Sequence, residues 1–477
     1  MDALRDYASE LDAEIHSTDP GGTINFPLMP VGQAVDMGHD ATGKPLFDPR
    51  VFSSREFFRN PYPYYRILRD HYPVFHDKLH NTYYVTRYED VWRCYFDDEG
   101  FNTIPKGSSS GVLGNTQLEL SGVEHRRRRN LYGQHLVGRG LDLRVPSIQR
   151  LARDMIKDWD NQLDTPWVID EGKKRIVELG AAFANEFPVR VVCEVLGFPN
   201  EAREQFFYWY NSMMSGLGGS LTHKQGLEAR QSLEDYVQDI VEERRRKPSF
   251  LKDEDGKIIG KDIITKLCET KVDGDYLSTE EITSNIALIV AAGGETTRGA
   301  IINMWYLLLQ HPDQFAALCA NPGETWDRAF HETLRHSSPI GGQPRHNTFD
   351  VDMHGMHVPA GSLMQMVDFS ANHDDRVFKD PEKFDIFRDD LYSGKLLRSG
   401  FMKEGRCAHM AFGVGPHLCP GAWISHQEAV EGSKILQKTL KNMRLCTERQ
   451  PKDIDGESLA PVGIVRVPQL WLEYDRA

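Results

Sequence analysis

The chain has 477 residues, of which 40% are hydrophobic and 26% charged, a composition typical of a soluble globular protein. Its formal net charge of -14 argues against nucleic acid or an anionic membrane as a general partner. The seven cysteines are scattered without paired spacing, which favours a reducing compartment over a disulfide framework.

The N-terminal residues carry no recognisable targeting signal. Residues 1–22 contain acids throughout and lack an apolar run of about seven residues, unlike a signal peptide or an anchor. The best apolar run, Ile286 to Ala292, is far shorter than the roughly 18 residues that span a bilayer. We therefore expect a cytoplasmic protein without a membrane span. Residues 1–50 mix Gly, Pro, Asp and His without a period and are interpreted as an N-terminal extension.

Short elements are predicted next. Residues Asn60 to Arg69 have the pattern of a helix, and Val74–Phe75 and Tyr83–Thr86 read as two strands. Residues Phe101 to Leu120 are rich in Gly and Ser and predict a mobile loop.

A basic run follows at residues 124–130. His125 and Arg129 are four residues apart and therefore share one face of a helix. Without further context, such an arginine run is most often a solvated surface. Residues Phe206 to Met214 are dense in aromatic residues and Met, which predicts a core helix. Residues Glu242 to Asp262 alternate acids and bases and predict an exposed connector.

The longest predicted helix begins at a capping box formed by Ser278 and Glu281 and runs to about Gln310. It contains the segment Ala292-Gly-Gly-Glu-Thr-Thr297, although each Gly costs about 1 kcal/mol of helix stability relative to Ala. Either the glycines permit a close crossing with another helix, or the segment has a function. A later helix carries Glu332 and Arg335 at a spacing that is common for exposed ion pairs of little energetic value.

The segment from Phe412 to Gly421 is neither helix nor strand in pattern. Its glycines predict a tight loop in which the backbone approaches another group closely. Cys419 ends this loop just before a helix predicted from Ala422 to Leu440, whose N-terminus favours a thiolate. Two alternatives are a small core cysteine and a zinc site. The zinc ligands would be Cys407, His409, His417 and Cys419, at a spacing unusual for zinc.

This loop resembles the haem-ligand loop of the cytochrome P450 family. The matching residues are Phe412, Gly413, Gly415, His417, Cys419 and Gly421. The segment Ala292–Thr297 resembles the family's oxygen-activation motif, and Glu332 with Arg335 resembles its Glu-x-x-Arg motif. The resemblance covers about residues 55–475, and it implies a mainly α fold with small β-sheets, the cytochrome P450 fold, with residues 51–477 as the haem domain.

The resemblance also implies a haem b cofactor and a role for each matching residue. Cys419 would ligate the iron, and Phe412 and Gly413 would belong to the cofactor-binding loop. His125, Arg129, Arg345 and His417 would bind the propionates, and the remaining arginines near His125 would face an acidic ferredoxin. Glu332, Arg335 and Arg388 would form a buried structural triad.

On the distal side, Thr296 would supply a hydroxyl donor and Glu295 an acid that relays protons. Because neighbouring residues point to different sides of a helix, Glu295 must move or act through water. The family's central helix bulges over the haem at this motif. The substrate pocket would include Leu288, Ala292, Ile340 and Gly341, with residues 206–214 as its lid. Residues 389–411 would form a basic surface loop, and residues 461–474 a terminal hairpin.

We therefore predict a soluble bacterial type of P450 monooxygenase. It would take electrons from NAD(P)H through a ferredoxin reductase and a ferredoxin, and use O2 to oxidise an apolar small molecule. A peroxide-driven P450 and a non-catalytic haem-binding protein are the alternatives. The identity of the substrate cannot be read from the sequence. Pro420, directly after the cysteine, lacks an N–H group that could donate to the sulfur, which predicts a lower haem reduction potential than in a Pro420→Leu variant.

Overall fold

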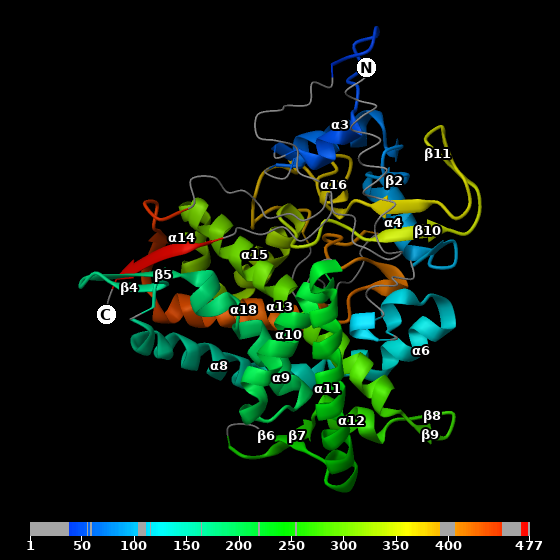
Figure 1. The fold of residues 1–477 in the computed structure, drawn as a ribbon. Helices are drawn as coiled ribbons and strands as arrows, with labels where there is room; N and C mark the ends of the chain where they lie inside the picture. Colours follow the sequence, from blue (N-terminus) through cyan, green and yellow to red (C-terminus); the bar gives the residue numbers. More distant parts are fainter. Residues whose placement is uncertain are drawn as a thin grey trace.

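Figure 1 shows a mainly helical chain with several small sheets. The computed structural model describes residues 38–54, 56–57, 60–103, 111–114, 116–163, 165–217, 220–252, 255–391, 406–450 and 469–475. In Figure 1 the larger sheet lies with the N-terminal helices in the upper right part, and most other helices gather below and to the left of it. The expectation for residues 1–37 lies outside the described residues.

The helices follow the sequence periodicity. They are α3 (Tyr62–His71), α4 (Tyr88–Phe96), α6 (Gly122–Tyr132), α7 (Arg139–Asp142), α8 (Val145–Asp158), α9 (Phe187–Leu196), α10 (Arg203–Leu217), α11 (Ser220–Arg246), α12 (Ile263–Glu269), α13 (Thr279–Gln310), α14 (Pro312–Ala320), α15 (Pro322–His336), α16 (Asp368–Ala371) and α18 (Ala422–Thr439).

The strands form two main sheets and three two-stranded ones. The five-stranded sheet has the order β1-β2-β13-β10-β3, and the four-stranded sheet has the order β14-β15-β5-β4. The pairs are β11-β12, β6-β7 and β8-β9. The strands are β1 (Val74–Asp77), β2 (Thr82–Val85), β3 (Phe101–Asn102), β4 (Val168–Asp170), β5 (Lys174–Glu178), β6 (Phe250–Lys252), β7 (Ile258–Lys261), β8 (Lys271–Val272), β9 (Asp275–Tyr276), β10 (Pro344–Asn347), β11 (Val351–Met353), β12 (Met356–Val358), β13 (Leu363–Met366), β14 (Lys441–Leu445) and β15 (Trp471–Asp475).

Helix α13 lies in the largest hydrophobic core and packs against α9, α11, α15 and α18. The predicted capping box is confirmed: the Ser278 hydroxyl accepts from the Glu281 N–H at 3.1 Å, and the Ser278 N–H donates to Glu281 Oε2 at 2.9 Å. Inside the core, the buried indole of Trp305 donates to the Ser433 hydroxyl of α18 at 3.0 Å. Because this N–H has a partner, the large ring can be buried without an unpaired polar group.

Two sequence expectations for the middle of the chain were wrong. Residues 242–262 are not a plain connector, because α11 continues to Arg246 and the hairpin β6-β7 follows. The aromatic segment of α10 is no lid on the cavity described below: Phe206, Trp209 and Met213 are buried in the core. The periodicity had favoured this core position. Of the predicted terminal hairpin, only β15 is described, and it pairs with β14 and β5.

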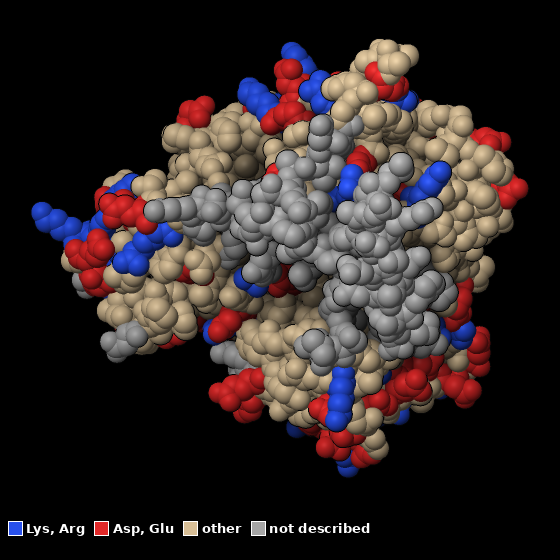
Figure 2. Space-filling view, turned by 45° about the horizontal axis from the view of Figure 1, so that its top comes forward, with Lys and Arg blue, Asp and Glu red and all other residues tan. Residues whose placement is uncertain are grey.

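Charges of both signs lie on the described surface. On the face shown in Figure 2, acidic side chains gather along the lower edge and mix with basic ones elsewhere along the rim, as the net charge of -14 suggests. Among the described residues, no helix has both the length and the apolar character needed to cross a bilayer.

Candidate active site

A cavity of about 280 Å³ lies between α13, α6 and the loop before α18. The sequence-predicted residues in its lining are His125, Arg129, Leu288, Ala292, Thr296, Ile340, Arg345, Phe412, Gly413, His417 and Cys419. The fold therefore brings most of the predicted site residues to one cavity. Glu295 and Gly341 do not line it, and the backbone carbonyl of Gly341 instead accepts from Phe369 at 3.2 Å.

The loop that carries Cys419 depends on two glycines. Gly413 and Gly415 have φ angles of +66° and +69°, in the left-handed region that glycine adopts without strain. A Cβ atom on Gly415 would also lie only 3.0 Å from Cα of Phe96 on α4. The Cys419 N–H donates to the Phe412 carbonyl at 2.8 Å. The tight backbone thus holds the thiol in the cavity wall at the start of α18.

The sulfur of Cys419 lies near backbone donors. Burial raises the pKa of the thiol, while the N–H groups of Gly421 and Ala422 and the charge of Arg129 partly offset that rise. Pro420 contributes no N–H, but the donors of the next two residues are present. A cation bound at the sulfur would deprotonate a buried thiol of this kind.

Two stacked histidines form a second part of the cavity wall. The rings of His125 and His417 stack with their centroids 3.8 Å apart. Burial, together with the charges of nearby arginines, lowers the pKa of His125 to about 4 and that of His417 to about 3. Both rings are therefore neutral near pH 7, each with one N–H to donate.

Several buried nitrogens in this wall lack a hydrogen bond, although Nε2 of His417 lies 3.7 Å from Oδ2 of Asp98. Nδ1 of His125, Nε2 of His417 and Nε of Arg345 make no hydrogen bond with the described residues. Buried polar groups without partners are rare, because each costs free energy. A group of unpaired donors next to the arginines Arg129 and Arg345 fits an anionic ligand with carboxylate groups.

The glycines of α13 allow this helix to pack closely against α9 and α10. A Cβ atom on Gly293 would lie 2.6 Å from the Val192 side chain of α9, and one on Gly294 would lie 2.5 Å from the ring of Tyr210 on α10. The interpretation as a close crossing, left open from the sequence, is thus confirmed. The bulge expected from the family is not observed, since α13 is continuous from Thr279 to Gln310.

The neighbouring residues Glu295 and Thr296 point to different sides, as expected. The Thr296 side chain lines the cavity, and its hydroxyl donates to the Ala292 carbonyl at 3.1 Å. The carboxylate of Glu295 accepts from Arg298 at 3.3 Å and from the Tyr210 hydroxyl at 3.5 Å. Glu295 must therefore leave these partners, or use water, to exchange a proton with Thr296.

Other cavity residues were not found from the sequence. Apolar lining comes from Val192, Val195 and Ile289, and polar lining from residues far apart in the chain. These polar residues are Tyr95, Gln117, Thr297, Gln343, Asp368, Ser425 and Glu428. Thr297 belongs to the segment Ala292–Thr297 that the sequence had singled out, and Ser425 and Glu428 lie one turn apart on α18, directly after the cysteine loop. Burial raises the pKa of Glu428 well above its usual value.

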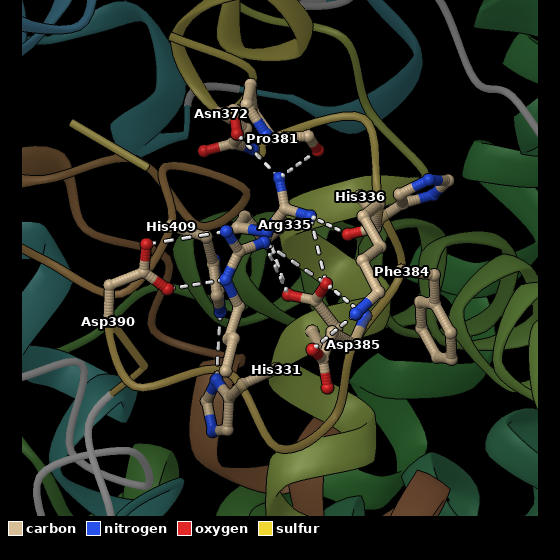
Figure 3. A network of polar contacts seen from close by, with 12 residues as sticks. His331, Arg335, His336, Asn372, Pro381, Phe384, Asp385, Asp390 and His409 are labelled. Carbon is tan, nitrogen blue, oxygen red and sulfur yellow. Dashed lines mark hydrogen bonds and ion pairs between the residues drawn. The ribbon is translucent and has the colours of Figure 1, made fainter. Parts of the chain in front are cut away.

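The predicted triad of Glu332, Arg335 and Arg388 is assembled as expected, and Figure 3 shows its Arg335 between Asn372, Pro381 and Asp385. Glu332 Oε2 lies 2.7 Å from Nε of Arg335, and Glu332 Oε1 lies 3.3 Å from Nη1 of Arg388. Arg335 also donates to the backbone carbonyls of Asn372, Pro381 and Lys383. Glu332 and Arg335 are at most 1% exposed. The pair therefore ties α15 to the segment that precedes the cysteine loop and is not a surface ion pair.

The zinc alternative is wrong. The Cys407 sulfur lies 3.2 Å from the Tyr88 hydroxyl, His409 lies 2.8 Å from His331, and His417 stacks on His125. In the described part of the chain, the one group of His, Cys, Asp and Glu close enough to share a metal ion is Asp98, His125 and His417. Most of the basic segment 389–411 lies outside the described residues.

The comparisons with known proteins agree with this geometry. The family model described as Cytochrome P450 matches residues 201–321 and 324–470, which is more than half of the chain. The chain belongs to the cytochrome P450 family. It is 28% identical over 408 residues to the pulcherriminic acid synthase of Bacillus subtilis, covering 83% of this chain and 92% of that protein. It is also 28% identical to the vitamin D(3) 25-hydroxylase of Pseudonocardia autotrophica, over 79% of this chain and 85% of the relative.

Solved structures show the same fold. CYP109Q5 from Chondromyces apiculatus superposes with a TM-score of 0.71 at 26% identity, over 88% of this chain and 97% of that chain. CYP109E1 from Bacillus megaterium, solved with corticosterone, gives a TM-score of 0.71 at 23% identity, over 88% of this chain and all of that chain. This P450 is therefore a haem-thiolate monooxygenase by family, and its cofactor is haem b.

The cavity fits that cofactor. The unpaired donors of His125, His417 and Arg345 suit two carboxylates, and the cysteine thiol lines the same cavity. When bound, a haem with a thiolate ligand supplies the activation of O2 and the transfer of one oxygen atom to the substrate.

Proposed function

We propose that this P450 takes electrons from NAD(P)H through a separate ferredoxin reductase and ferredoxin, and hydroxylates or oxidatively dealkylates a small-to-medium apolar molecule. The observation that carries the proposal is one cavity lined by a cysteine thiol, a threonine hydroxyl and unpaired buried donors. The apolar side chains of Val192, Leu288 and Ile289 in the same lining support an apolar substrate.

Each site residue has a proposed role. Cys419 provides the thiolate ligand from the loop that contains Phe412 and Gly413. Propionate binding is the proposed role of His125, Arg129, Arg345 and His417. Thr296 holds a proton at the distal side of the cavity, and Glu295 exchanges protons with solvent. Leu288, Ala292 and Ile340 belong to the substrate side, whereas Gly341 lies outside the cavity lining.

The docking of a ferredoxin is proposed on the basic run of α6. Arg127 is 45% exposed and pairs with Asp273 at 2.7 Å, and Arg128 pairs with Glu124 at 2.9 Å. An acidic partner would have to compete with these surface pairs, which are worth little individually. Electron transfer should therefore weaken steeply as salt screens the contact.

The decisive test is reconstitution with a surrogate ferredoxin, its reductase and NADPH. Compounds are first screened for a change of the haem absorption that reports a low-to-high-spin shift. NADPH consumption with product formation supports the proposal. A ligand that shifts the spin state without any consumption would contradict it and favour a non-catalytic haem protein. Turnover with peroxide alone favours the peroxide-driven alternative, against which the cavity-lining Thr296 speaks.

The substrate class stays broad because the relatives differ. Their printed names include pulcherriminic acid synthase, vitamin D(3) 25-hydroxylase and biotin biosynthesis cytochrome P450. A screen should therefore include pulcherriminic acid precursors, steroid and secosteroid skeletons, and fatty acyl compounds. Binding is read from the spin shift before any turnover is attempted.

Thr296→Ala is expected to separate NADPH consumption from product formation. The variant lacks the hydroxyl that holds a proton in the cavity, and general acid groups contribute about 100-fold or more to such steps. We expect product per NADPH to fall at least about 10-fold. Thr296→Ser keeps the hydroxyl and serves as the control. Equal yields in the alanine and serine variants would contradict the role of Thr296.

Pro420→Leu is expected to raise the haem reduction potential. The leucine adds a backbone N–H beside Cys419, where the N–H groups of Gly421 and Ala422 already lower the pKa of the thiol. Donors near the thiolate make it a weaker electron donor. Spectroelectrochemical titration measures the shift. Pro416→Ala, in the same loop but three residues before the cysteine, is the control. An unchanged midpoint potential in Pro420→Leu would contradict the proposed effect of the missing N–H group.

A further inference from the structure

Asp368 is a buried carboxyl group in the cavity wall that matches none of the family motifs in this sequence. It is the first residue of α16, is 2% exposed, and lines the cavity together with Tyr95, Gln343 and Arg345. An ionised carboxylate in such a place costs free energy unless it is paired. The contacts of Asp368 therefore indicate whether its carboxyl group is ionised or protonated.

The contacts of Asp368 come from α4 and β10. The Tyr95 hydroxyl donates to Oδ1 of Asp368 at 2.8 Å. The backbone N–H of Gln343 donates to the same hydroxyl at 3.0 Å, so the tyrosine proton is directed to Asp368. The guanidinium of Arg345 lies over the Tyr95 ring at 5.0 Å. It attracts Asp368 by its charge, but among the described residues no hydrogen bond reaches the second carboxyl oxygen.

The protonation of Asp368 follows from this environment. Burial raises the pKa of Asp368 more than the hydrogen bond from Tyr95 and the charge of Arg345 lower it, and the resulting pKa is about 8. Near pH 7 the group is mostly neutral. A neutral carboxyl group can accept from Tyr95 with one oxygen and donate with the other.

We propose that neutral Asp368 is a further haem-binding residue, which donates a hydrogen bond to the haem carboxylate that Arg345 attracts. The inference rests on the proposed propionate-binding role of Arg345. When Asp368 loses its proton, the bond is lost and two carboxylates face each other in a poorly solvated wall. Haem retention then weakens. The added negative charge also favours the ferric state, so the reduction potential falls as pH rises through the pKa.

The other groups around Asp368 keep one protonation state over this range. Burial raises the pKa of Cys407 to about 11 and that of Tyr95 well above its usual value. The pKa values of His125 and His417 lie at about 4 and about 3. The titratable or charged groups near Asp368 are Arg69 on α3, Tyr95 on α4, Arg345 on β10 and Cys407. Across the cavity or next to it lie Asp98, His125, Arg129, Tyr132, His417, Cys419 and Glu428. Asp98 and the buried Glu428, whose pKa is raised by burial, are the other acids that need a control, and Asp98→Asn and Glu428→Gln supply it.

The test measures haem loss from the holoprotein to an excess of a haem-scavenging apoprotein, together with the midpoint potential, at a series of pH values. A hydrogen bond to a charged group is stronger than one between neutral groups. We therefore expect haem loss from the wild-type protein to rise about 10-fold between about pH 6.5 and about pH 9.5. Over the same range the midpoint potential should fall. Asp368→Asn keeps a donor and cannot ionise, so its haem loss should change less than about two-fold.

A second variant tests the direction in which the pH dependence of haem loss shifts. Tyr95→Phe removes the hydrogen bond that lowers the pKa of Asp368. The transition, meaning the rise of haem loss with pH, should therefore move to higher pH. Asp98→Asn should leave it in place. If Asp368 had only a structural role, Asp368→Asn and Tyr95→Phe would lower the stability against unfolding without changing the pH at which haem loss rises.

The outcomes separate this inference from the proposed function. A wild-type transition that persists in Asp368→Asn, or a Tyr95→Phe transition at lower pH, overturns the inference. If the wild-type protein binds haem and turns over but shows no pH-dependent retention, only this inference fails. If it binds no haem at any pH, the proposed function fails with it.

Discussion

Cys419→Ala is expected to lower kcat/KM of the reconstituted enzyme by at least about 100-fold, equivalent to about 2.7 kcal/mol of transition-state stabilisation. Among the described residues that line the cavity, Cys419 carries the only thiol. Alanine can offer no ligand to the iron, so the electron donation that favours O–O bond cleavage is lost. NADPH-dependent product formation and the spectrum of the carbon monoxide complex measure the effect.

The matched control is Cys319→Ala. Cys319 lies on α14, is free and partly buried, and is not in the cavity lining. Its replacement should leave turnover and the carbon monoxide spectrum within about two-fold of the wild-type protein. An active Cys419→Ala variant with an unchanged spectrum would refute the ligand assignment. An equal loss in both variants would point to a general effect of removing cysteines.

Arg335→Ala is expected to lower the free energy of unfolding by about 3–5 kcal/mol, because it leaves the buried carboxylate of Glu332 without its nearest partner. The change also removes the donors to the carbonyls of Asn372, Pro381 and Lys383. Arg388, 3.3 Å from Glu332, retains part of the attraction. Urea unfolding followed by tryptophan fluorescence measures the loss, with haem content as a second readout.

The control for this prediction is an ion pair of similar length on the surface. Arg150 lies 2.9 Å from Glu194, and the side chains are 44% and 37% exposed. Arg150→Ala should cost less than about 1 kcal/mol, because water screens the pair and replaces it readily. If both variants lose the same stability, the burial of the Glu332 pair has no special role. Arg335→Lys should recover only part of the loss, since lysine cannot form the bidentate contact.

Local motifs were predictable because their physics is local. The capping box at Ser278 and Glu281 was confirmed, since its two hydrogen bonds join residues three positions apart. The glycines at 413 and 415 take the positive φ angles that a tight loop requires. The different directions of Glu295 and Thr296 follow from helix geometry alone.

Other features could not be settled from the sequence, because a neighbour far away in the chain decides them. Gly293 and Gly294 indicated either a packing contact or a functional bulge, and the side chains of Val192 and Tyr210 are what fill the space. The alternation of charges at residues 242–262 gave no sign of the hairpin β6-β7, because charged residues tolerate an exposed strand as well as a loop. The spacing of Glu332 and Arg335 is the same for a surface pair and a buried one.

The sequence by itself determined the family, the cysteine loop, the long helix with its Glu-Thr pair and the mainly helical fold, because each depends on residues close together in the chain. Only the tertiary structure decided which side chains share the cavity. Tyr95 and Asp368 are 273 positions apart and meet at 2.8 Å, a contact to which no local pattern points. Burial, which makes Asp368 neutral and leaves His125 and His417 as unpaired donors, exists only once the chain is folded. Charge states in a site depend on what excludes water from it, and that depends on the whole fold.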